Sequence, residues 1–370
     1  MDGRTIAMRG AKRAPTMADV AHLAHVSVAT VSRVLNGDPG PSQQTRESVL
    51  AAMRTLQYKP NRNAQGLRSG RSMLVGVVVP DISNPYFMAL ARGCEDIAHE
   101  HGFSVIVAST DEDPRSEVRE LEAILGHGVA HIVLAPTGEN EAAQSLLADP
   151  SVACVLVDRD IPSTSLSVVL NDDAGAIDSL VRVLVDSGHR SVGVVAGPQT
   201  TYTGRVRLDA ARAALVRFGL ALPDTHTVVG EFLDGFGYAG ILQLLQRPDH
   251  PTALIACNNV LLQEVIRATR MMRLHIPNDI SVVGIAEQQF VELLQPAFTI
   301  AQTDPRTIGR LAMKVMLGQG GAQTPVVPQR IVVPTPVVSG ESVARLSSWG
   351  WVPAQNETTA EPNMASDAPL

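Results

Sequence analysis

Two helix-starting patterns lie close together near the beginning of the sequence, and the short gap between them restricts how this region can fold. Thr16 with Asp19 three residues later is typical of a capped helix start, and Ser27 before VATVSRVL is a second such cap. Only residues 24–26 separate the two helices, which leaves room for a tight turn. His25 suits this turn because histidine enters the left-handed backbone region more readily than most residues. The pattern predicts a helix-turn-helix, whose second helix enters the major groove of DNA.

A third helix is expected over Gln43–Leu56, with Ser42 as its cap. Its apolar residues fall on one face and can pack against the first two helices. The core predicted for this three-helix head consists of Val20, Ala24, Val26, Val31, Val34, Leu35, Val49, Ala52, Met53 and Leu56.

From Met73 onward, short β-branched runs alternate with longer amphipathic segments. Strands are expected at MLVGVVVP, FSVIVAST, HIVLAP, VACVLVD, SVGVVAG, THTVVGEF, TALIAC and ISVVGIA, and helices at Tyr86–His101, Pro114–Gly126, Ala174–Ser187, Gly204–Phe218, Phe236–Gln246, Asn259–Met272 and Thr307–Leu317. Such alternation predicts parallel sheets with helices on both faces. The expected fold is an all-α helix-turn-helix head followed by an α/β core of two doubly wound parallel-sheet subdomains.

The chain is expected to cross between the two halves of the core near residues 170–171, 301–303 and 330–332. The predicted domain boundaries are 1–15 for a disordered basic arm, 16–60 for the head, 61–72 for a hinge helix and linker, 73–346 for the core and 347–370 for a disordered tail. Within the core, residues 73–170 and 302–330 are expected to form the first half, and residues 171–301 and 331–346 the second.

The distribution of charge indicates which part would meet nucleic acid. The formal net charge of −7 for 370 residues argues by itself against a nucleic-acid partner. Residues 1–72, however, hold eleven Lys and Arg against four Asp and Glu, whereas the remainder holds nineteen against thirty-three. A basic head on an acidic body directs DNA to one end of the chain. With 45% hydrophobic but only 4% aromatic residues, the core must be aliphatic, as in Val-rich parallel strands.

The sequence lacks the motifs that are typical of metal-binding, secreted, membrane-spanning or enzymatic proteins. Cys94, Cys154 and Cys257 lie far apart without zinc-ligand spacing, and they suit buried positions in a reducing compartment. The charged N-terminal residues do not form a signal peptide, and no stretch has the length of a membrane-spanning helix. We find no catalytic constellation or phosphate-cradling fingerprint, so no enzymatic activity, cofactor or metal is expected. We expect a soluble cytoplasmic protein that associates with the nucleoid when it is bound to DNA.

The run T-x-x-D-V-A-x-x-A-x-V-S-x-x-T-V-S-R-V-L-N over residues 16–36, followed by T-R-E-x-V and Y-x-P-N-x-x-A-x-x-L, resembles the LacI/GalR family of bacterial repressors. The likeness continues to about Leu346. It implies a core of the periplasmic-binding-protein type. It also implies a transcriptional regulator, most simply a repressor, that binds double-stranded operator DNA and responds to a small-molecule effector in the core cleft. A homodimer on a pseudo-palindromic operator is expected because one such head contacts few bases.

The second helix carries the residues expected to read bases. Arg33 can donate a fork to guanine O6 and N7, and Val28 and Ala29 offer apolar contacts to thymine methyl groups. The alternative for Val28 or Ala29 is that it only packs. The resemblance assigns base reading to the same positions. It assigns further DNA-binding positions to Thr16, Ser27, Thr30, Ser32, Asn36, Ser42, Thr45, Tyr58 and Asn61, and it implies that Leu67 wedges into the central base step while Ala64 lies along the minor-groove floor.

Ligands of such α/β folds bind where the C-terminal ends of the strands of the two halves face each other. The candidate effector-binding residues are Asp81, Asn84, Tyr86 and Phe87 from the first half, and Asp158, Arg207, Phe232, Asn258 and Gln302 from the second. Arg207 can donate a fork, Asn258 can donate and accept, and Phe232 offers a ring face. The resemblance marks these three as recurrent effector contacts, although each alone also fits an ordinary surface or packing position.

Two departures from the family pattern bear on the effector. The family usually has Gly-aromatic-Asp-Asp where this chain has Gly-Ile-Ala-Glu over residues 284–287, and the common Asn-Asp pair is here Asn258-Asn259. In the family the first aspartate commonly grips the effector, which Ala286 cannot do. We expect the effector to be a sugar, a sugar derivative or another small polar metabolite. Losing this aspartate argues against a plain hexose held in the usual way, and one hypothesis is an effector that is less hydroxylated or is anionic, with Arg207 dominant. The alternative is a cleft that has lost its effector.

We expect the dimer face on the core, in the helices Tyr86–His101 and Pro114–Gly126 and in matching surfaces of the second half. A solute-binding protein of a transport system would share the core fold, but the head and the lack of a signal peptide disfavour it. A sugar-processing enzyme is disfavoured because its catalytic residues are missing.

Overall fold

A computed structural model of the chain describes residues 15–35, 37–58, 72–232, 237–318 and 327–346. The chain divides into two units, residues 1–72 and 73–370, each of which is described by itself. The expected basic arm, hinge helix and C-terminal tail lie outside the described residues. Every helix in the described ranges is too short or too polar to pass through a lipid bilayer.

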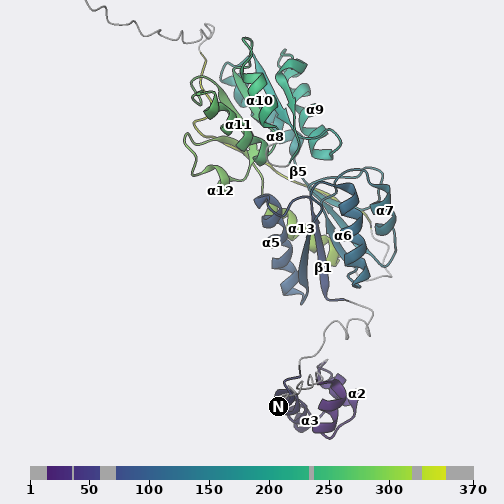
Figure 1. Cartoon of the computed structure of the whole chain (residues 1–370). Helices are drawn as coiled ribbons and strands as arrows, with labels where there is room; N and C mark the ends of the chain where they lie inside the picture. Colours follow the sequence, from purple (N-terminus) through teal and green to yellow (C-terminus); the bar gives the residue numbers. More distant parts are fainter. Residues whose placement is uncertain (1–14, 36, 59–71, 233–236, 319–326, 347–370) are drawn as a thin grey trace, which may run out of the picture. The chain divides into compact units, whose positions relative to one another are not determined.

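The first unit is a three-helix head consisting of α1 (Met17–Leu23), α2 (Val28–Leu35) and α3 (Gln43–Leu56) (Figure 1). The predicted bounds of α3 are confirmed, and the predicted apolar residues form the core, to which Met17, Ala21 and Tyr58 also contribute. His25 has a φ of 54°, so the turn between α1 and α2 passes through the left-handed region as predicted.

The first half of the core is a parallel sheet with helices on both faces (Figure 1). In spatial order its strands are β11 (Arg330–Val333), β5 (Ser167–Asn171), β4 (Ala153–Val157), β3 (His131–Leu134), β1 (Leu74–Val79) and β2 (Ser104–Ser109). One face is covered by α5 (Pro85–Glu100) and α13 (Pro305–Gly318), and the other by α6 (Pro114–Gly126) and α7 (Glu141–Leu147). Burial on both faces accounts for the nearly continuous Val and Leu runs in these strands.

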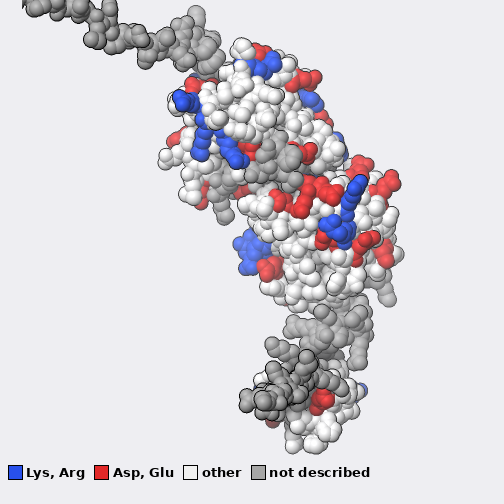
Figure 2. Space-filling model, in the orientation of Figure 1, with Lys and Arg blue, Asp and Glu red and all other residues white. Residues whose placement is uncertain are grey.

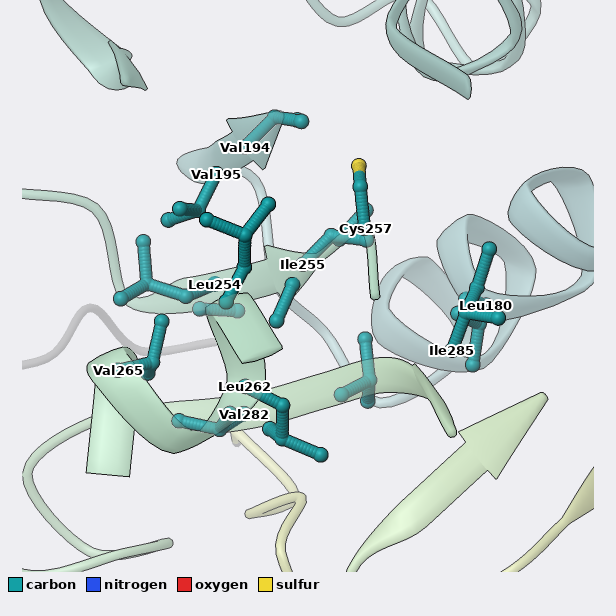
Figure 3. Close-up of a cluster of buried hydrophobic side chains, with 14 of the residues drawn as sticks. Leu180, Val194, Val195, Leu254, Ile255, Cys257, Leu262, Val265, Val282 and Ile285 are labelled. Atoms are coloured by element: carbon teal, nitrogen blue, oxygen red, sulfur yellow. The ribbon is translucent and has the colours of Figure 1, made fainter. Parts of the chain in front are cut away.

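The second half repeats this plan. In spatial order its strands are β12 (Val337–Val338), β10 (Thr299–Gln302), β9 (Ser281–Ala286), β8 (Ala253–Ala256), β6 (Val192–Ala196) and β7 (Thr227–Val229), and β12 alone among these is antiparallel to its neighbour. Its helices are α8 (Asp173–Asp186), α9 (Tyr202–Arg217), α10 (Tyr238–Leu245), α11 (Asn259–Met271) and α12 (Gln288–Val291), with a 3-10 turn at Asp224–His226. Aliphatic side chains from β6, β8, β9, α8 and α11 meet in its core (Figure 3).

The chain crosses between the halves after β5, after β10 and after β11. The expectation that residues from 331 onward belong to the second half is wrong for Ile331–Val333, which pair with Val169–Asn171 of β5. This β-branched run finds hydrogen-bond partners along the open edge of the first sheet before the chain crosses. Gln302 likewise ends β10 of the second sheet and does not open the first half.

Two glycines allow α5 and α13 to pack with their backbones in contact. A Cβ atom at Gly93 would lie 2.1 Å from the carbonyl oxygen of Arg306, and one at Gly309 would lie 2.0 Å from that of Leu90. Arg306 also donates from Nε and Nη2 to the two carboxylate oxygens of Asp96, at 2.7 and 3.0 Å. These contacts hold α13, which follows the second half in sequence, against a helix of the first half.

We predict that Gly309→Ala lowers the free energy of unfolding of the core by about 1–3 kcal/mol, because the helix backbones must separate to admit the methyl group. Urea denaturation followed by circular dichroism measures the change. The control is Gly318→Ala on the same helix, where an added Cβ meets no atom within 4 Å and alanine favours the helix. Equal destabilisation by both substitutions would contradict the close approach.

Candidate functional site

α2 presents the side chains expected to read DNA. Val31 and Val34 are buried in the core of the head, whereas Val28, Ala29 and Arg33 are exposed, Val28 to 41%. Ala29 and Arg33 are one helical turn apart and share a face. The exposure of Val28 argues against the alternative that it only packs. The helix therefore offers apolar groups and a guanidinium group side by side on its free surface.

Side-chain caps fix the start of each helix in the head. Thr16 and Asp19 form a capping box, in which Thr16 N donates to Asp19 Oδ2 at 2.7 Å and Asp19 N donates to Thr16 Oγ1 at 3.4 Å. Ser27 and Ser42 each accept the backbone N–H three residues on, at 3.1 and 3.2 Å. All three predicted caps are confirmed. The hydroxyl groups of α2 and α3 thus lie at helix N-termini, where backbone N–H groups and the helix dipole favour phosphate.

The remaining DNA-binding candidates fall into two groups. Ser32 and the hydroxyl-bonded Thr30 and Thr45 are half-buried, and Tyr58 packs against the core of the head. Asn36, Asn61, Ala64 and Leu67 lie outside the described residues.

A cavity in the core collects the effector candidates from both halves. It is lined by Asp81, Asn84, Tyr86, Phe87, Glu112, Asp158, Arg159, Thr203, Arg207, Phe232, Asn258, Asn259, Ile285, Glu287 and Thr303. Every effector candidate named from the sequence is in this set except Gln302. The next residue, Thr303, lines the cavity in its place, because successive residues of an extended chain point in opposite directions.

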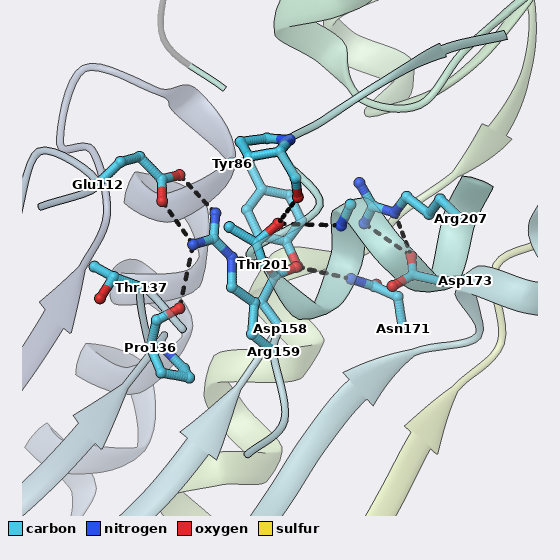
Figure 4. Close-up of polar contacts among 12 residues, drawn as sticks. Tyr86, Glu112, Pro136, Thr137, Asp158, Arg159, Asn171, Asp173, Thr201 and Arg207 are labelled. Carbon is cyan, nitrogen blue, oxygen red and sulfur yellow. Dashed lines mark hydrogen bonds and ion pairs between the residues drawn. The ribbon is translucent and has the colours of Figure 1, made fainter. Parts of the chain in front are cut away.

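Asp158 was expected from the second half, and this assignment is wrong. It directly follows β4 of the first sheet, with a φ of 63°. Its Oδ1 accepts the Tyr86 hydroxyl at 2.7 Å and the Asn171 amide at 3.3 Å, and that amide also donates to the Tyr86 oxygen at 2.8 Å (Figure 4). This network ties α5 to the point where the chain first crosses to the second half.

Arg207 is buried at the cavity wall and is already bound by protein groups. Its Nε and Nη2 donate to Asp173 Oδ1 at 2.9 and 2.8 Å (Figure 4). Its Nη1 donates to the Cys257 carbonyl oxygen at 2.7 Å. Burial raises the pKa of Asp173 to about 6, against the opposing effect of the Arg207 charge. The hypothesis of an anionic effector gripped mainly by Arg207 is therefore not supported by this geometry.

A second buried ion pair lines the cavity and was not found from the sequence. Arg159 donates from Nη1 and Nη2 to the two oxygens of Glu112 at 2.7 and 2.6 Å, and from Nη1 to the Pro136 carbonyl at 3.1 Å (Figure 4). Its guanidinium carbon also lies 5.4 Å from the ring centre of Phe232 in the second half. The polar run Asp-Arg-Asp directly after a buried strand was the available signal for Arg159.

The structure shows where the side chains lie at residues 286 and 259, at which the chain departs from the family pattern. Ala286 is buried in β9, and the carboxyl group of the next residue, Glu287, lines the cavity. Glu287 accepts the Thr303 hydroxyl at 3.1 Å and an Asn259 amide hydrogen at 3.4 Å. The same Asn259 amide donates to Asn84 Oδ1 at 2.9 Å, which is a direct hydrogen bond between the two halves of the core.

Metal binding receives no support from the part of the chain that the structure describes, since no group of three or more His, Cys, Asp or Glu side chains there is placed to hold an ion.

Comparisons with known proteins agree with this architecture. Residues 16–61 match the bacterial regulatory proteins of the lacI family, and residues 181–343 match the periplasmic binding protein-like domain. The chain is 32% identical to catabolite control protein A of Priestia megaterium, over 81% of this chain and 91% of that protein. It is 29% identical to the ribose operon repressor of Escherichia coli (strain K12), over 82% and 92%. The lac repressor dimer bound to operator and the anti-inducer ONPF superposes with a TM-score of 0.80 at 25% identity, covering 90% of this chain and all of that one.

We predict that Arg207→Met lowers the stability of the core by about 3–5 kcal/mol, because Asp173 is left buried without its partner. Urea denaturation at neutral pH gives the change. The double substitution Arg207→Met with Asp173→Asn should recover part of the loss, since it removes the orphaned charge. A single substitution that costs less than about 1 kcal/mol would show that the pair is not buried as described.

Proposed function

Because this chain belongs to the LacI family of bacterial regulatory proteins and is a DNA-binding transcriptional regulator, we propose that it is a repressor that binds a pseudo-palindromic operator as a homodimer. The observation that carries the proposal is the capped three-helix head with an exposed α2. The named relatives are a catabolite control protein and a ribose operon repressor, and neither name denotes an enzyme. Such a repressor works in the bacterial cytoplasm and joins the nucleoid when it is bound to DNA.

In this proposal α2 lies in the major groove. Arg33 reads a guanine, and Val28 and Ala29 contact thymine methyl groups. Thr16, Ser27, Thr30, Ser32, Asn36, Ser42, Thr45, Tyr58 and Asn61 hold the sugar-phosphate backbone, and Ala64 and Leu67 enter the minor groove at the operator centre.

The dimer would form through the core. In the first half, Ile106 and Val107 on the edge strand β2 are each 40% exposed. An apolar edge strand left open invites pairing with another chain. β2 lies between α5 and α6 in sequence, which are the helices predicted to form the dimer face. A second copy that covers this strand would bring two heads to two half-sites of one operator.

The cavity would hold the effector, a small polar molecule with a ring or chain that can stack on Phe232. Both halves contribute to its wall, so a bound molecule favours one relative arrangement of the halves over another. Because each dimer partner is contacted through the first half, that preference alters whether two heads can bind one operator. The core would thus have two arrangements of its halves, and the effector would shift the population towards the arrangement that it binds more tightly.

We predict that Arg33→Ala weakens binding to the operator by about 1–3 kcal/mol, since one bidentate contact with guanine is lost. Fluorescence anisotropy titrations on an operator duplex and a scrambled duplex give both affinities. The control is Arg270→Ala, which removes the same charge from an exposed position of the core. An Arg33→Ala protein that keeps its preference for operator over scrambled DNA would remove Arg33 from the reading role.

Substituting the apolar edge should break the dimer. We expect Val107→Lys to raise the dimer dissociation constant at least about tenfold, because a charge must be buried against the partner. Analytical ultracentrifugation of the full chain measures this constant. Val216→Lys on α9, where the valine is 68% exposed, is the control and should leave the constant unchanged. A monomeric parent protein, or the same constant in both variants, would refute a dimer through β2.

A further inference from the structure

Two kinds of carboxyl group lie in the cavity wall or directly behind it. Glu112 and Asp173 are each within 3 Å of a guanidinium nitrogen, of Arg159 and Arg207 respectively. Their charges are therefore balanced inside the protein.

Asp158 and Glu287 are not balanced in this way. Asp158 accepts a hydrogen bond from the Tyr86 hydroxyl. Arg159 Nε lies 3.7 Å from its carboxylate, but this guanidinium group is already paired with Glu112. Glu287 forms no ion pair with any Lys, Arg or His of the described residues, and its partners are the neutral side chains of Thr303 and Asn259. The side chains that line the cavity, with Asp81 counted and Asp173 left out because it lies behind Arg207, thus carry four negative and two positive charges when all are ionised.

Neither arginine can easily receive an acidic ligand. Arg207 already donates hydrogen bonds to Asp173 and to the Cys257 carbonyl oxygen. Arg159 already donates hydrogen bonds to Glu112 and to the Pro136 carbonyl oxygen, and its guanidinium carbon lies over the ring of Phe232. An anion could reach only the remaining N–H groups of each guanidinium, whose positive charge is already offset by a buried carboxylate. On the outer surface seen in Figure 2, acidic side chains also border the junction between the two halves of the core.

We infer that the cleft selects an effector bearing a positively charged nitrogen, such as an amino sugar or another hydroxylated amine, and that Glu287 is the carboxylate that binds this nitrogen. The inference rests on the proposed function, because it specifies the ligand of that regulator. Glu287 is reachable, since it lines the cavity and is only partly buried. Asp158 lines the same cavity from the opposite half, so one cationic group drawn between the halves gains from both charges.

Asn259 supports this role of Glu287. An aspartate at this position, which is the residue expected from the family pattern, would place a further negative charge against Glu287, because the Asn259 Nδ2 atom lies 3.4 Å from Glu287 Oε2. Asparagine instead donates to Glu287 and to Asn84 with the same amide group. The chain therefore holds the Glu287 carboxyl in place with neutral donors and leaves its charge for a ligand.

The surroundings of Glu287 also favour its protonated form. Burial raises the pKa of Glu287, the Asp158 charge raises it further, and Arg207 opposes them. The groups that hydrogen-bond to Glu287 or act on its charge are Thr303, Asn259 of α11, Arg207 of α9 and Asp158. A carboxyl group whose folded pKa is raised stabilises the fold below its unfolded pKa of about 4.3, and this contribution is lost as pH rises through the folded value. A bound ammonium group would displace the proton and reverse this loss.

The test compares the full chain with Glu287→Gln and, as the matched control, Glu341→Gln, which alters an exposed glutamate of the same half. The probes are trios that share one ring: D-glucosamine, D-glucose and D-glucuronate, and D-galactosamine, D-galactose and D-galacturonate. Thermal unfolding from pH 5 to 8 without ligand and calorimetric titration with each probe are the measurements. Operator binding by the same preparations is measured separately.

We expect the melting temperature of the parent protein to fall relative to that of Glu287→Gln as pH rises. We also expect an amine of at least one trio to bind more tightly than its neutral partner, with no binding by the acids. Glu287→Gln should weaken that binding roughly ten- to a hundredfold, as for the loss of a charge-assisted hydrogen bond, and Glu341→Gln should not.

The inference fails if an acid or a neutral sugar binds as tightly as its amine, if no amine binds, or if the amine binds Glu287→Gln unchanged. It also fails if the melting curves of the parent and Glu287→Gln run parallel across the pH range. Any of these results with intact operator binding would refute the amine ligand and leave the repressor proposal standing. Loss of operator binding would refute the repressor proposal whatever the probes do.

Discussion

Charged groups that leave water must be neutralised where they are buried, and the cleft of the core is built around this requirement. Arg207 from the second half is matched by Asp173 at the start of α8, and Arg159 from the first half is matched by Glu112. Both pairs lie beside the first crossover of the chain, where Asn171, Tyr86 and Asp158 form a hydrogen-bonded network. Each half thus pairs its own buried arginine with a carboxylate of the same half. Most of these groups also line the cavity that a ligand would enter.

This arrangement links the cleft to the rest of the core. The carboxyl ends of the parallel strands of each half supply the residues that line the cavity, and contacts such as Asn84 with Asn259 and Arg159 with Phe232 bridge the halves directly. A molecule that enters the cavity must either break these contacts between the halves or add new contacts to them. Its binding energy can therefore be converted into a change of geometry, which is the physical basis of regulation in the proposed repressor.

Much of this architecture could be predicted from the sequence because its signals are local. The caps at Thr16, Ser27 and Ser42, the left-handed turn at His25 and the bounds of α3 and α6 depend on neighbouring residues alone. The cavity residues Arg207, Phe232 and Asn258 came from the resemblance to a family together with the rule for strand ends.

Other features depend on contacts between distant parts of the chain and could not be predicted in this way. α7 and β5 were not expected. Ile331–Val333 of β11 were assigned to the wrong half, because β11 lies at the edge of the first sheet and pairing there is decided by the partner strand. Glu112 and Arg159 belong to no sequence motif. Their ion pair forms only because the loops that follow two different strands lie side by side in the folded chain. Thr303 was missed in favour of Gln302 by one residue, which in an extended segment reverses the direction of the side chain. The hypothesis that Arg207 mainly binds an anionic effector is not supported, because Arg207 already donates two hydrogen bonds to Asp173.

The central claim is that two copies of the head read one stretch of duplex DNA. The most direct measurement is a selection of bound duplexes from a random-sequence pool by the purified full chain, at an ionic strength near 0.15 M where non-specific phosphate contacts are weakened. The account predicts that the enriched sequences contain two inverted half-sites around a common centre. Enrichment of a single unpaired half-site, or of no sequence at all, would contradict it.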